Sequence, residues 1–299
     1  MPERKSSRFD LRRLLRFSLL SAGEEPGAVP ATESELLFEL TGENPGNRLF
    51  GRYDDDDVRA VLERSGLLRG LARLGFPEPV LSLECADPSE QRICLYATEP
   101  TRDRLLVETR LRLLNFHLRH ATGPFPAGTS FRMLVILWLV LSNPDGRFSL
   151  DRPRLPGQQR PGLGLLAEAL RLLSFFSRDL SVDGVLDVPE HFHTALFYSR
   201  LFRHLDPSEE GRLLAISRDL AGVPLALASD AIRCGCLVDR ATAKPLPWSP
   251  SEQVMPGRGP LRRFLRSREY QEARDRASGR LRVAVDWDLY REKLAAREP

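Results

Sequence analysis

Residues 80–222 alternate segments of β-strand pattern with segments of amphipathic helix pattern. Residues 165–180 and 189–202 carry apolar side chains at helical spacing, and the short apolar run 184–188 between them predicts a buried strand. Three earlier stretches place β-branched and apolar residues between polar ones and are bounded by turn residues: 80–86, 92–97 and 103–114. This order predicts an α/β fold in which a mixed central sheet is flanked by helices.

The secondary structure of the segment between these two groups is predicted mainly from its length. Residues 130–143 are strongly apolar and longer than a typical strand, which predicts a buried helix. Residues 147–164 then predict a short extended segment that ends in a turn rich in proline and glycine. Near the C-terminus, residues 281–287 predict a strand that completes the sheet.

Changes in composition divide the chain into three parts. Residues 1–50 predict an N-terminal helical arm and linker, 51–240 the α/β core, and 241–299 a proline-rich connector followed by a helix-strand-helix cap. The arm is a basic amphipathic segment, which suits either docking on a membrane or partner helix or packing on its own domain. The aspartates at 54–57 predict the first turn of a helix, where carboxylates complement the helix dipole.

Charge and cysteine content exclude several classes of protein. The 44 basic and 41 acidic side chains leave a net charge of +3, too small to predict a nucleic-acid partner. The four cysteines are too few for a disulfide scaffold, and no secretory pattern precedes them, so the expected compartment is a reducing cytoplasm. The longest apolar run falls short of the roughly 20 residues that cross a bilayer, so no membrane span is expected.

A hexapeptide with two glycines carries the main functional signal. Residues 159–164 read Gln-Arg-Pro-Gly-Leu-Gly and stand directly before the predicted helix 165–180. Glycines let a backbone approach phosphate closely, and the N-terminus of the following helix attracts the same anion. The segment resembles the Gln/Arg-x-x-Gly-x-Gly/Ala pyrophosphate loop of the GNAT superfamily of N-acetyltransferases. This resemblance implies that acetyl-CoA or another acyl-CoA binds at Gln159, Arg160, Gly162, Leu163 and Gly164.

The resemblance extends over about residues 140–207, because the family also follows its phosphate loop with helix, strand and helix. The last helix of the family carries an Asn-x-x-Ala-x-x-x-Tyr-x-x-Leu-Gly-Phe pattern. This chain matches it at Tyr198 and Leu201 and departs from it at His191, Thr194 and Phe202. The match implies that Tyr198 is the general acid that protonates the departing thiolate, a role suited to a phenol with an ordinary pKa of about 10.

The base that would accept the proton of a substrate amine has three main candidates. His191 and His193 stand at the start of the helix that carries Tyr198, and Glu108 lies within an apolar strand. The histidines also permit a metal site together with other His, Glu or Cys residues, but their spacing matches no standard zinc module, and no metal is assigned.

Three functions remain open on the sequence alone. The leading one is acyl transfer from acyl-CoA to a small-molecule or protein amine. The second is a non-catalytic binding or assembly module with an acetyltransferase-like fold, and the third is an unrelated α/β protein whose glycine segment is only a turn. The acceptor, the acyl-chain length and the oligomeric state do not follow from these residues.

Overall fold

The computed structural model describes residues 48–296, and every structural statement below concerns this part of the chain. The predicted arm over residues 1–50 therefore lies almost entirely outside the described residues. Where the description begins, Leu49 and Tyr53 form an antiparallel bridge that closes a tight turn.

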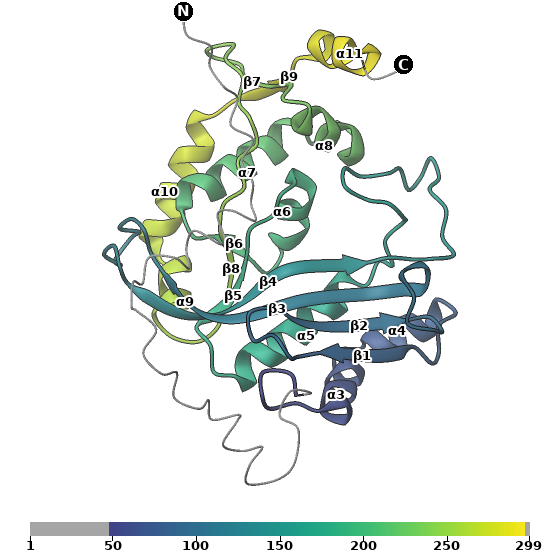
Figure 1. Cartoon of the computed structure of the whole chain (residues 1–299). Coiled ribbons are helices and arrows are strands. Elements are labelled where there is room, and N and C mark those ends of the chain that lie inside the picture. The colour runs from purple at the N-terminus through teal and green to yellow at the C-terminus, as the bar shows by residue number, and fades with distance from the viewer. Residues whose placement is uncertain (1–47, 297–299) are drawn as a thin grey trace, which may run out of the picture. The chain divides into compact units, whose positions relative to one another are not determined.

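The core of the fold is a seven-stranded mixed sheet in the order β1-β2-β3-β4-β5-β8-β6 (Figure 1). The first four strands are antiparallel neighbours, β4 and β5 are parallel, and β8 pairs antiparallel with β5 and β6. The expected α/β class with a mixed sheet is thus confirmed. The strands are β1 (Val80–Glu84), β2 (Gln91–Tyr96), β3 (Leu105–His117), β4 (Ser130–Leu141), β5 (Gly184–Asp187), β6 (Arg203–His204) and β8 (Gln253–Pro256).

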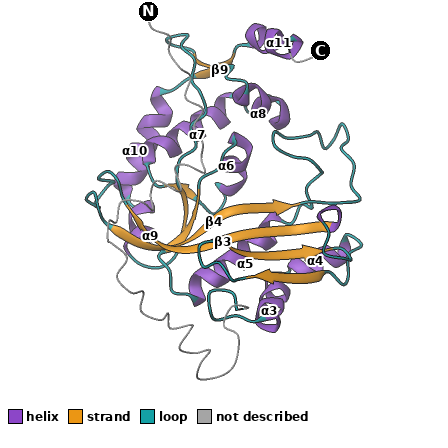
Figure 2. Ribbon diagram, viewed as in Figure 1, coloured by secondary structure: helices purple, strands orange, loops and turns teal. Residues whose placement is uncertain are grey.

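The segment expected to form a buried helix is strand β4, so that prediction is wrong. β4 pairs with β3 from Ser130 to Leu141, and the two strands run side by side in Figure 2. Leu134 and Ile136 enter the core on one face of the sheet, while Met133 and Val135 enter the core on the other. A strand buried on both faces shows no alternation of polar and apolar residues, which is why its pattern resembled a helix.

One face of the sheet is covered by the helices α3 (Asp55–Ser65), α4 (Leu67–Arg73) and α5 (Leu166–Asp179). Leu62, Leu71 and Phe176 from these helices pack with Ile93 and Leu134 of the strands. Asp54 caps α3 by accepting a hydrogen bond from the Asp57 backbone N–H, and Asp57 completes a capping box. The expected helix start at the aspartates and the helix after the glycine segment are therefore confirmed.

The second half of the chain adds helices around β5, β8 and β6. They are α6 (Phe192–Tyr198), α7 (Pro207–Asp219), α8 (Leu225–Arg233), α9 (Pro260–Leu265), α10 (Arg268–Arg280) and α11 (Trp287–Ala295). α9 and α10 pack on the opposite face of the sheet from α5, where Phe264 and Tyr270 meet Leu186 and Val254. None of the described helices is both long enough and apolar enough to span a bilayer.

The C-terminal part contributes to the sheet differently from the expectation. The strand near residue 283, β9 (Val283–Val285), pairs with β7 (Leu237–Asp239) in a separate two-stranded sheet and does not complete the main one. The strand that enters the main sheet is β8, from within the proline-rich segment. Residues 147–164, expected to be extended, lie in a long loop that contains no strand beyond a bridge between Ser142 and Gly162.

Two helical glycines give a matched test of the α7–α10 packing. A Cβ on Gly211 of α7 would lie 2.4 Å from the Arg274 backbone oxygen of α10, whereas a Cβ on Gly279 would have no atom within 4 Å. We expect Gly211→Ala to lower the free energy of unfolding by about 1–3 kcal/mol because the helices must separate. Gly279→Ala should raise it by up to ~1 kcal/mol through helix propensity. Urea unfolding of both variants is the measurement, and equal effects would contradict the close approach.

Candidate functional site

The candidate site lies where β4 and β5 diverge. The two strands pair in parallel only over Met133–Val135 with Gly184–Leu186. Beyond Val135 the register of β4 with β3 skips Leu137, so β4 carries a bulge. On the edge away from β3, no described strand pairs with residues 136–140. Figure 1 shows β4 continuing across the view while β5 leads upward to α6.

The divergence leaves a gap between β4 and β5. The glycine segment, residues 159–164, lies at the far end of this gap. The Asn143 N–H donates to the Pro161 oxygen over 2.8 Å, and the Leu163 N–H donates to the Leu141 oxygen over 3.3 Å. Residues 161–163 thus lie beside the end of β4 on the edge that β5 occupies further back. α5 begins two residues after Gly164, and no side chain caps its first turn. Backbone N–H groups at such an uncapped end are donors for an anion.

The two glycines of the segment have different conformations. Gly164 is exposed, has a φ of +72° and would place a Cβ with no atom within 4 Å. Gly162 is outside the left-handed region, is half-buried, and would place its Cβ 3.5 Å from the Leu141 oxygen. Gly164 is therefore the position where a side chain is costly and where space for a phosphate is open.

The other predicted cofactor-binding residues are engaged in different ways. Gln159 is exposed, and the Leu163 side chain is buried in the core. The Arg160 guanidinium donates to the backbone oxygen and the carboxylate of Asp103 over 2.6 and 2.8 Å. Arg160 thus fastens the loop to the short 3₁₀ helix Arg102–Arg104 and does not face the first turn of α5 as an unpaired cation.

The predicted histidines form a stacked pair at the start of α6. His191 precedes the helix in an extended conformation, so its ring lies over the ring of His193 at 5.3 Å and 16°. His193 Nδ1 lies 2.7 Å from the Ser229 hydroxyl of α8. A Cβ on Gly157 would lie 2.8 Å from His191 Nε2, which shows how closely the long loop packs on this pair.

Burial keeps both imidazoles neutral near pH 7. It lowers the pKa of His193 to about 4, with a smaller contribution from His191. Burial also lowers the pKa of His191, partly offset by the negative charge of Glu190. A neutral ring is the form that accepts a proton, but a pKa near 4 makes His193 a weak base.

Tyr198 does not lie beside the histidines. At about 100° per residue, its side chain leaves α6 roughly 140° from that of His193. It is only 5% exposed and packs in the core with Phe202, whose ring stacks on it at 5.2 Å. Burial raises the pKa of Tyr198 well above 10, and the nearby charge of Asp187 raises it further.

Asp187 is the functional candidate that the sequence pattern missed. It ends β5, is buried, and its Oδ2 has no hydrogen-bond partner. Burial raises the pKa of this carboxyl to about 7, while the Val188 backbone N–H lowers it. The only sequence signal was an acidic residue within the apolar run 184–188. Its partners were not recognisable, because β8 lies far along the chain.

The carboxyl of Asp187 adjoins a buried polar network. Gln253 of β8 is its register partner, and Gln253 Nε2 donates to the Ala195 oxygen over 3.2 Å and to His204 Nε2 over 3.1 Å. The other imidazole nitrogen of His204 lies 2.9 Å from the Ser251 hydroxyl. The Gln253 Oε1 atom is buried and has no partner. A buried carboxylate oxygen without a donor favours a protonated Asp187, which is itself a donor.

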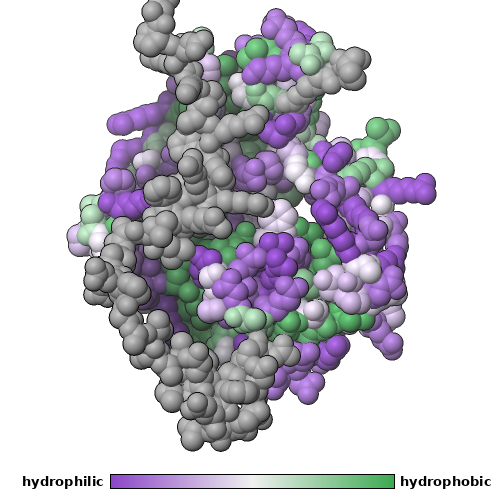
Figure 3. Space-filling model, viewed as in Figure 1, coloured by the Kyte–Doolittle hydropathy of each residue, from purple (hydrophilic) through white to green (hydrophobic). Residues whose placement is uncertain are grey.

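Glu108 lies away from Tyr198. It pairs in register with Cys94 and Val140, so it lies on the face of the sheet opposite the core cluster that contains Tyr198. Its carboxylate forms an ion pair with Arg110 at 2.7 Å. Figure 3 shows hydrophilic side chains gathered over β2 and β3, with hydrophobic surface on either side. Asp187 thus lies near enough to Tyr198 to raise its pKa, whereas Glu108 and His193 do not lie beside Tyr198.

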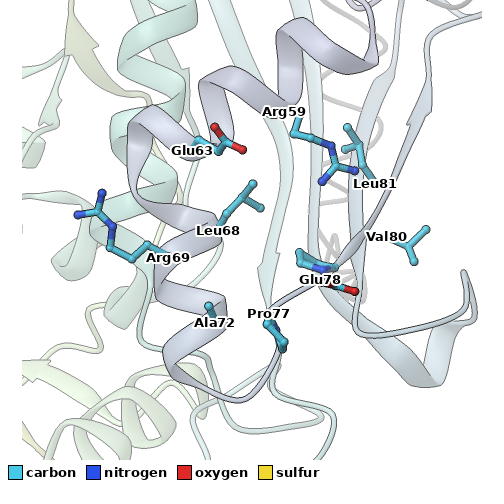
Figure 4. A pocket seen from close by; sticks show the side chains of 10 residues that line it. Arg59, Glu63, Leu68, Arg69, Ala72, Pro77, Glu78, Val80 and Leu81 are labelled. Atoms are coloured by element: carbon cyan, nitrogen blue, oxygen red, sulfur yellow. The ribbon is translucent and has the colours of Figure 1, made fainter.

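No metal centre marks the gap among the described residues. Within residues 48–296, no three His, Cys, Asp or Glu side chains come together as metal ligands. A cavity of about 600 Å³ lies elsewhere, between α3, α4 and β1 (Figure 4). Its charged lining is balanced, with Arg59 and Arg69 beside Glu63 and Glu78. The features of the gap that bear on function are its backbone geometry and the buried Asp187 and Tyr198.

The pKa of Asp187 predicts how stability depends on pH. An unfolded aspartate ionises near pH 3.9, whereas folded Asp187 stays protonated to about pH 7. Its stabilising contribution is therefore complete below pH 4 and is lost as the pH rises through 7. Because asparagine does not titrate, Asp187→Asn should gain stability relative to the wild type by roughly 4 kcal/mol between pH 4 and 8. Urea unfolding at several pH values measures this difference, and a constant difference would refute it.

Comparisons with known proteins provide no relative from which a function can be inferred. No family model, curated protein or solved structure matches the chain. The described features that bear on function are the divergence of β4 from β5, the open Gly164 beside the uncapped α5, and the buried pair of Asp187 and Tyr198.

Proposed function

We propose that this protein transfers an acyl group from acyl-coenzyme A to an amine. The observation that carries the proposal is the gap between β4 and β5, which has an unpaired strand edge along one side and the uncapped start of α5 at its end. In this proposal the coenzyme lies along the gap, with its phosphates at Gly164 and its thioester directed toward Asp187 and Tyr198.

Two parts of coenzyme A have a chemical counterpart in the gap. The pyrophosphate suits the N–H groups at the start of α5, where the helix dipole favours negative charge. The pantetheine arm carries two amides, and the edge of β4 over residues 136–140 offers backbone N–H and C=O groups to pair with them. Gly164 suits close approach because it is exposed and a Cβ there would meet no protein atom.

The reaction needs one base and one acid. Asp187, with a pKa raised to about 7, is matched to accept a proton from the attacking amine near neutral pH. The amine nitrogen forms a bond to the acyl carbon, and the bond between that carbon and sulfur breaks. Tyr198 then supplies the proton that the thiolate takes as it leaves, and direct attack requires no covalent enzyme intermediate.

The second candidate is a binding or assembly module without catalysis. Two observations favour it: Tyr198 is only 5% exposed, and Arg160 is held by Asp103. In this alternative the same gap holds the coenzyme, but the thioester stays remote from Asp187 and Tyr198. Binding alone therefore does not separate the two candidates, whereas release of free thiol does.

Coenzyme binding is tested at Gly164 with a matched glycine as control. Gly128, in the turn between β3 and β4, is also exposed, has a φ of +84° and would likewise place a Cβ with no atom within 4 Å. Valine at either position brings similar backbone strain, but only Gly164→Val places a side chain at the proposed phosphate site. We expect isothermal titration with acetyl-CoA to show at least a ~tenfold loss for Gly164→Val and none for Gly128→Val. Wild-type protein that fails to bind acetyl-CoA would exclude both candidates.

Catalysis is tested at Tyr198 and Asp187. Tyr198→Phe keeps the packed ring and removes the proton, and Asp187→Asn keeps the shape and removes the base. Each variant should retain acetyl-CoA affinity while turnover falls about 10²- to 10⁴-fold, as expected for a positioned acid or base. A free-thiol assay with a panel of amines gives turnover. Wild-type protein that binds acetyl-CoA and releases thiol with none of them would support the binding module.

A further inference from the structure

We propose that a second site, beside α9, binds a compact anion carrying two or more phosphate groups. A shallow cavity of about 550 Å³, wide open to solvent, lies there, and its lining residues are far along the chain from the glycine loop. Its lining consists of four arginines and one glycine: Arg258, Gly259, Arg262, Arg263 and Arg266. No carboxylate and no aromatic side chain contributes to this lining.

The arginines lie on or next to α9, a helix whose position is fixed by its buried side chains. Leu261, Phe264 and Leu265 of α9 are buried in the core, so Arg262 and Arg263 project from the opposite side of the helix. The ring of Phe264 packs edge-on against Phe125 at 5.5 Å and Tyr270 at 5.3 Å. The positions from which these cationic side chains extend are therefore fixed by core packing.

None of the four cavity arginines forms an ion pair with any residue that the structure describes. Arginines in the next helix do find partners: Arg268 contacts Glu272 at 2.6 Å, and Arg274 contacts Asp275 at 2.8 Å. Four exposed cations that share one concave surface without a counter-charge produce a local positive potential. This potential is not visible in the net charge of +3, because acidic residues elsewhere balance it.

The cavity of Figure 4 and the α9 cavity differ in the residues that line them. The two cavities have similar volumes, about 600 and 550 Å³. In the first, Glu63 and Glu78 offset Arg59 and Arg69, and apolar side chains make up the rest of the lining. The α9 cavity has neither carboxylates nor apolar side chains, so only a ligand rich in negative charge suits it.

The composition of the lining selects the class of anion. Guanidinium groups bind phosphate oxygens in bidentate fashion, and several cations favour a ligand with several adjacent negative charges. The lining has no aromatic ring on which a nucleic-acid base would stack and no apolar residue to enter a lipid surface. A polyphosphate group fits these features, either as a free inorganic chain or as the triphosphate of a nucleotide.

The test is isothermal titration of the full chain with inorganic tripolyphosphate at constant ionic strength. Wild-type protein should bind it more tightly than orthophosphate. The double variant Arg262→Gln, Arg263→Gln should lose at least ~tenfold in affinity, because hydrogen bonds to charged groups are lost. The control, Arg59→Gln with Arg69→Gln in the other cavity, removes the same charge and should leave the affinity unchanged. Arg59 and Arg69 line the cavity of Figure 4, and neither lines the α9 cavity.

Two further ligands identify the source of the phosphate groups. ATP that binds more tightly than tripolyphosphate assigns a nucleotide to the cavity, and equal or weaker binding assigns a free polyphosphate. A single-stranded oligonucleotide that binds more tightly than both, and loses affinity in the Arg262, Arg263 double variant, would overturn the proposal in favour of nucleic acid. Absence of tripolyphosphate binding, or equal binding by that variant, would overturn it outright.

This site is separable from the proposed coenzyme site. Because Arg262 and Arg263 are exposed, their replacement should leave the unfolding midpoint unchanged, which serves as the folding control. Gly164→Val should retain tripolyphosphate binding, and the arginine double variant should retain acetyl-CoA binding. If acetyl-CoA affinity depends on Arg262 and Arg263 but not on Gly164, the coenzyme does not bind at the glycine loop. That result would contradict the proposed coenzyme site and leave the anion site standing.

Discussion

The parallel contact between β4 and β5 determines where everything at the candidate site lies. It spans three residue pairs and begins at Gly184, where a Cβ would lie 2.8 Å from the Met255 oxygen of β8, the strand on the other edge of β5. A side chain at this position would force β8 away from β5. With β8 in place, β5 has neighbours on both edges, and its described pairing with β4 ends at Val135. The divergence creates the unpaired edge of β4 and sets the end of β5, with Asp187, against α6.

The chain runs from the end of β4 to the start of β5 through a long loop and α5. Residues 161–163 lie against the end of β4, and the left-handed Gly164 then turns the chain into the helix. α5 packs on the sheet through residues such as Leu173 and Phe176, which fixes the position of its first turn. The first turn of α5 and the buried end of β5 are thus held by the same core.

The local sequence pattern was sufficient to predict an element that has one buried face. α5 buries residues at helical spacing, and β1 and β2 are short segments rich in apolar residues and bounded by turn residues, so the sequence predicts all three elements. Local pattern failed for β4, whose two faces are both covered, and for β8, whose prolines resemble those of a connector. The place of β5 between β4 and β8 depends on a contact between distant parts of the chain that no local pattern reveals.

The same limit applies to the site residues. The glycine segment was recognisable because its backbone requirement is local, although the left-handed residue is Gly164 and the sequence does not distinguish it from Gly162. Asp187 was missed because its unusual pKa depends on burial beneath elements from other parts of the chain. The histidine pair illustrates the opposite case. A helix would direct the two rings apart, but His191 stands before the helix begins, and the rings stack.

Burial decides whether Tyr198 can act as an acid in the proposed reaction. A thiol in water has a pKa of about 8.5, so transfer of a proton to a solvated thiolate from a phenol with a pKa well above 10 is unfavourable. Burial acts on thiols in the same direction, and in this protein it is the main cause that raises the pKa of Cys85 to about 11. A thioester sulfur that enters apolar surroundings like those of Tyr198 therefore leaves as a much stronger base, which brings the two groups closer to balance.

Acid and leaving group must consequently be buried together. The proposed phosphate site at Gly164 is exposed, whereas Tyr198 lies in the core, so the pantetheine arm has to carry the sulfur from one to the other along the edge of β4. A coenzyme held only at the start of α5 would leave its sulfur in water, where Tyr198 has no chemical role. The depth that the thioester reaches, rather than the presence of the phenol, is what separates an acyltransferase from a binding module on this fold.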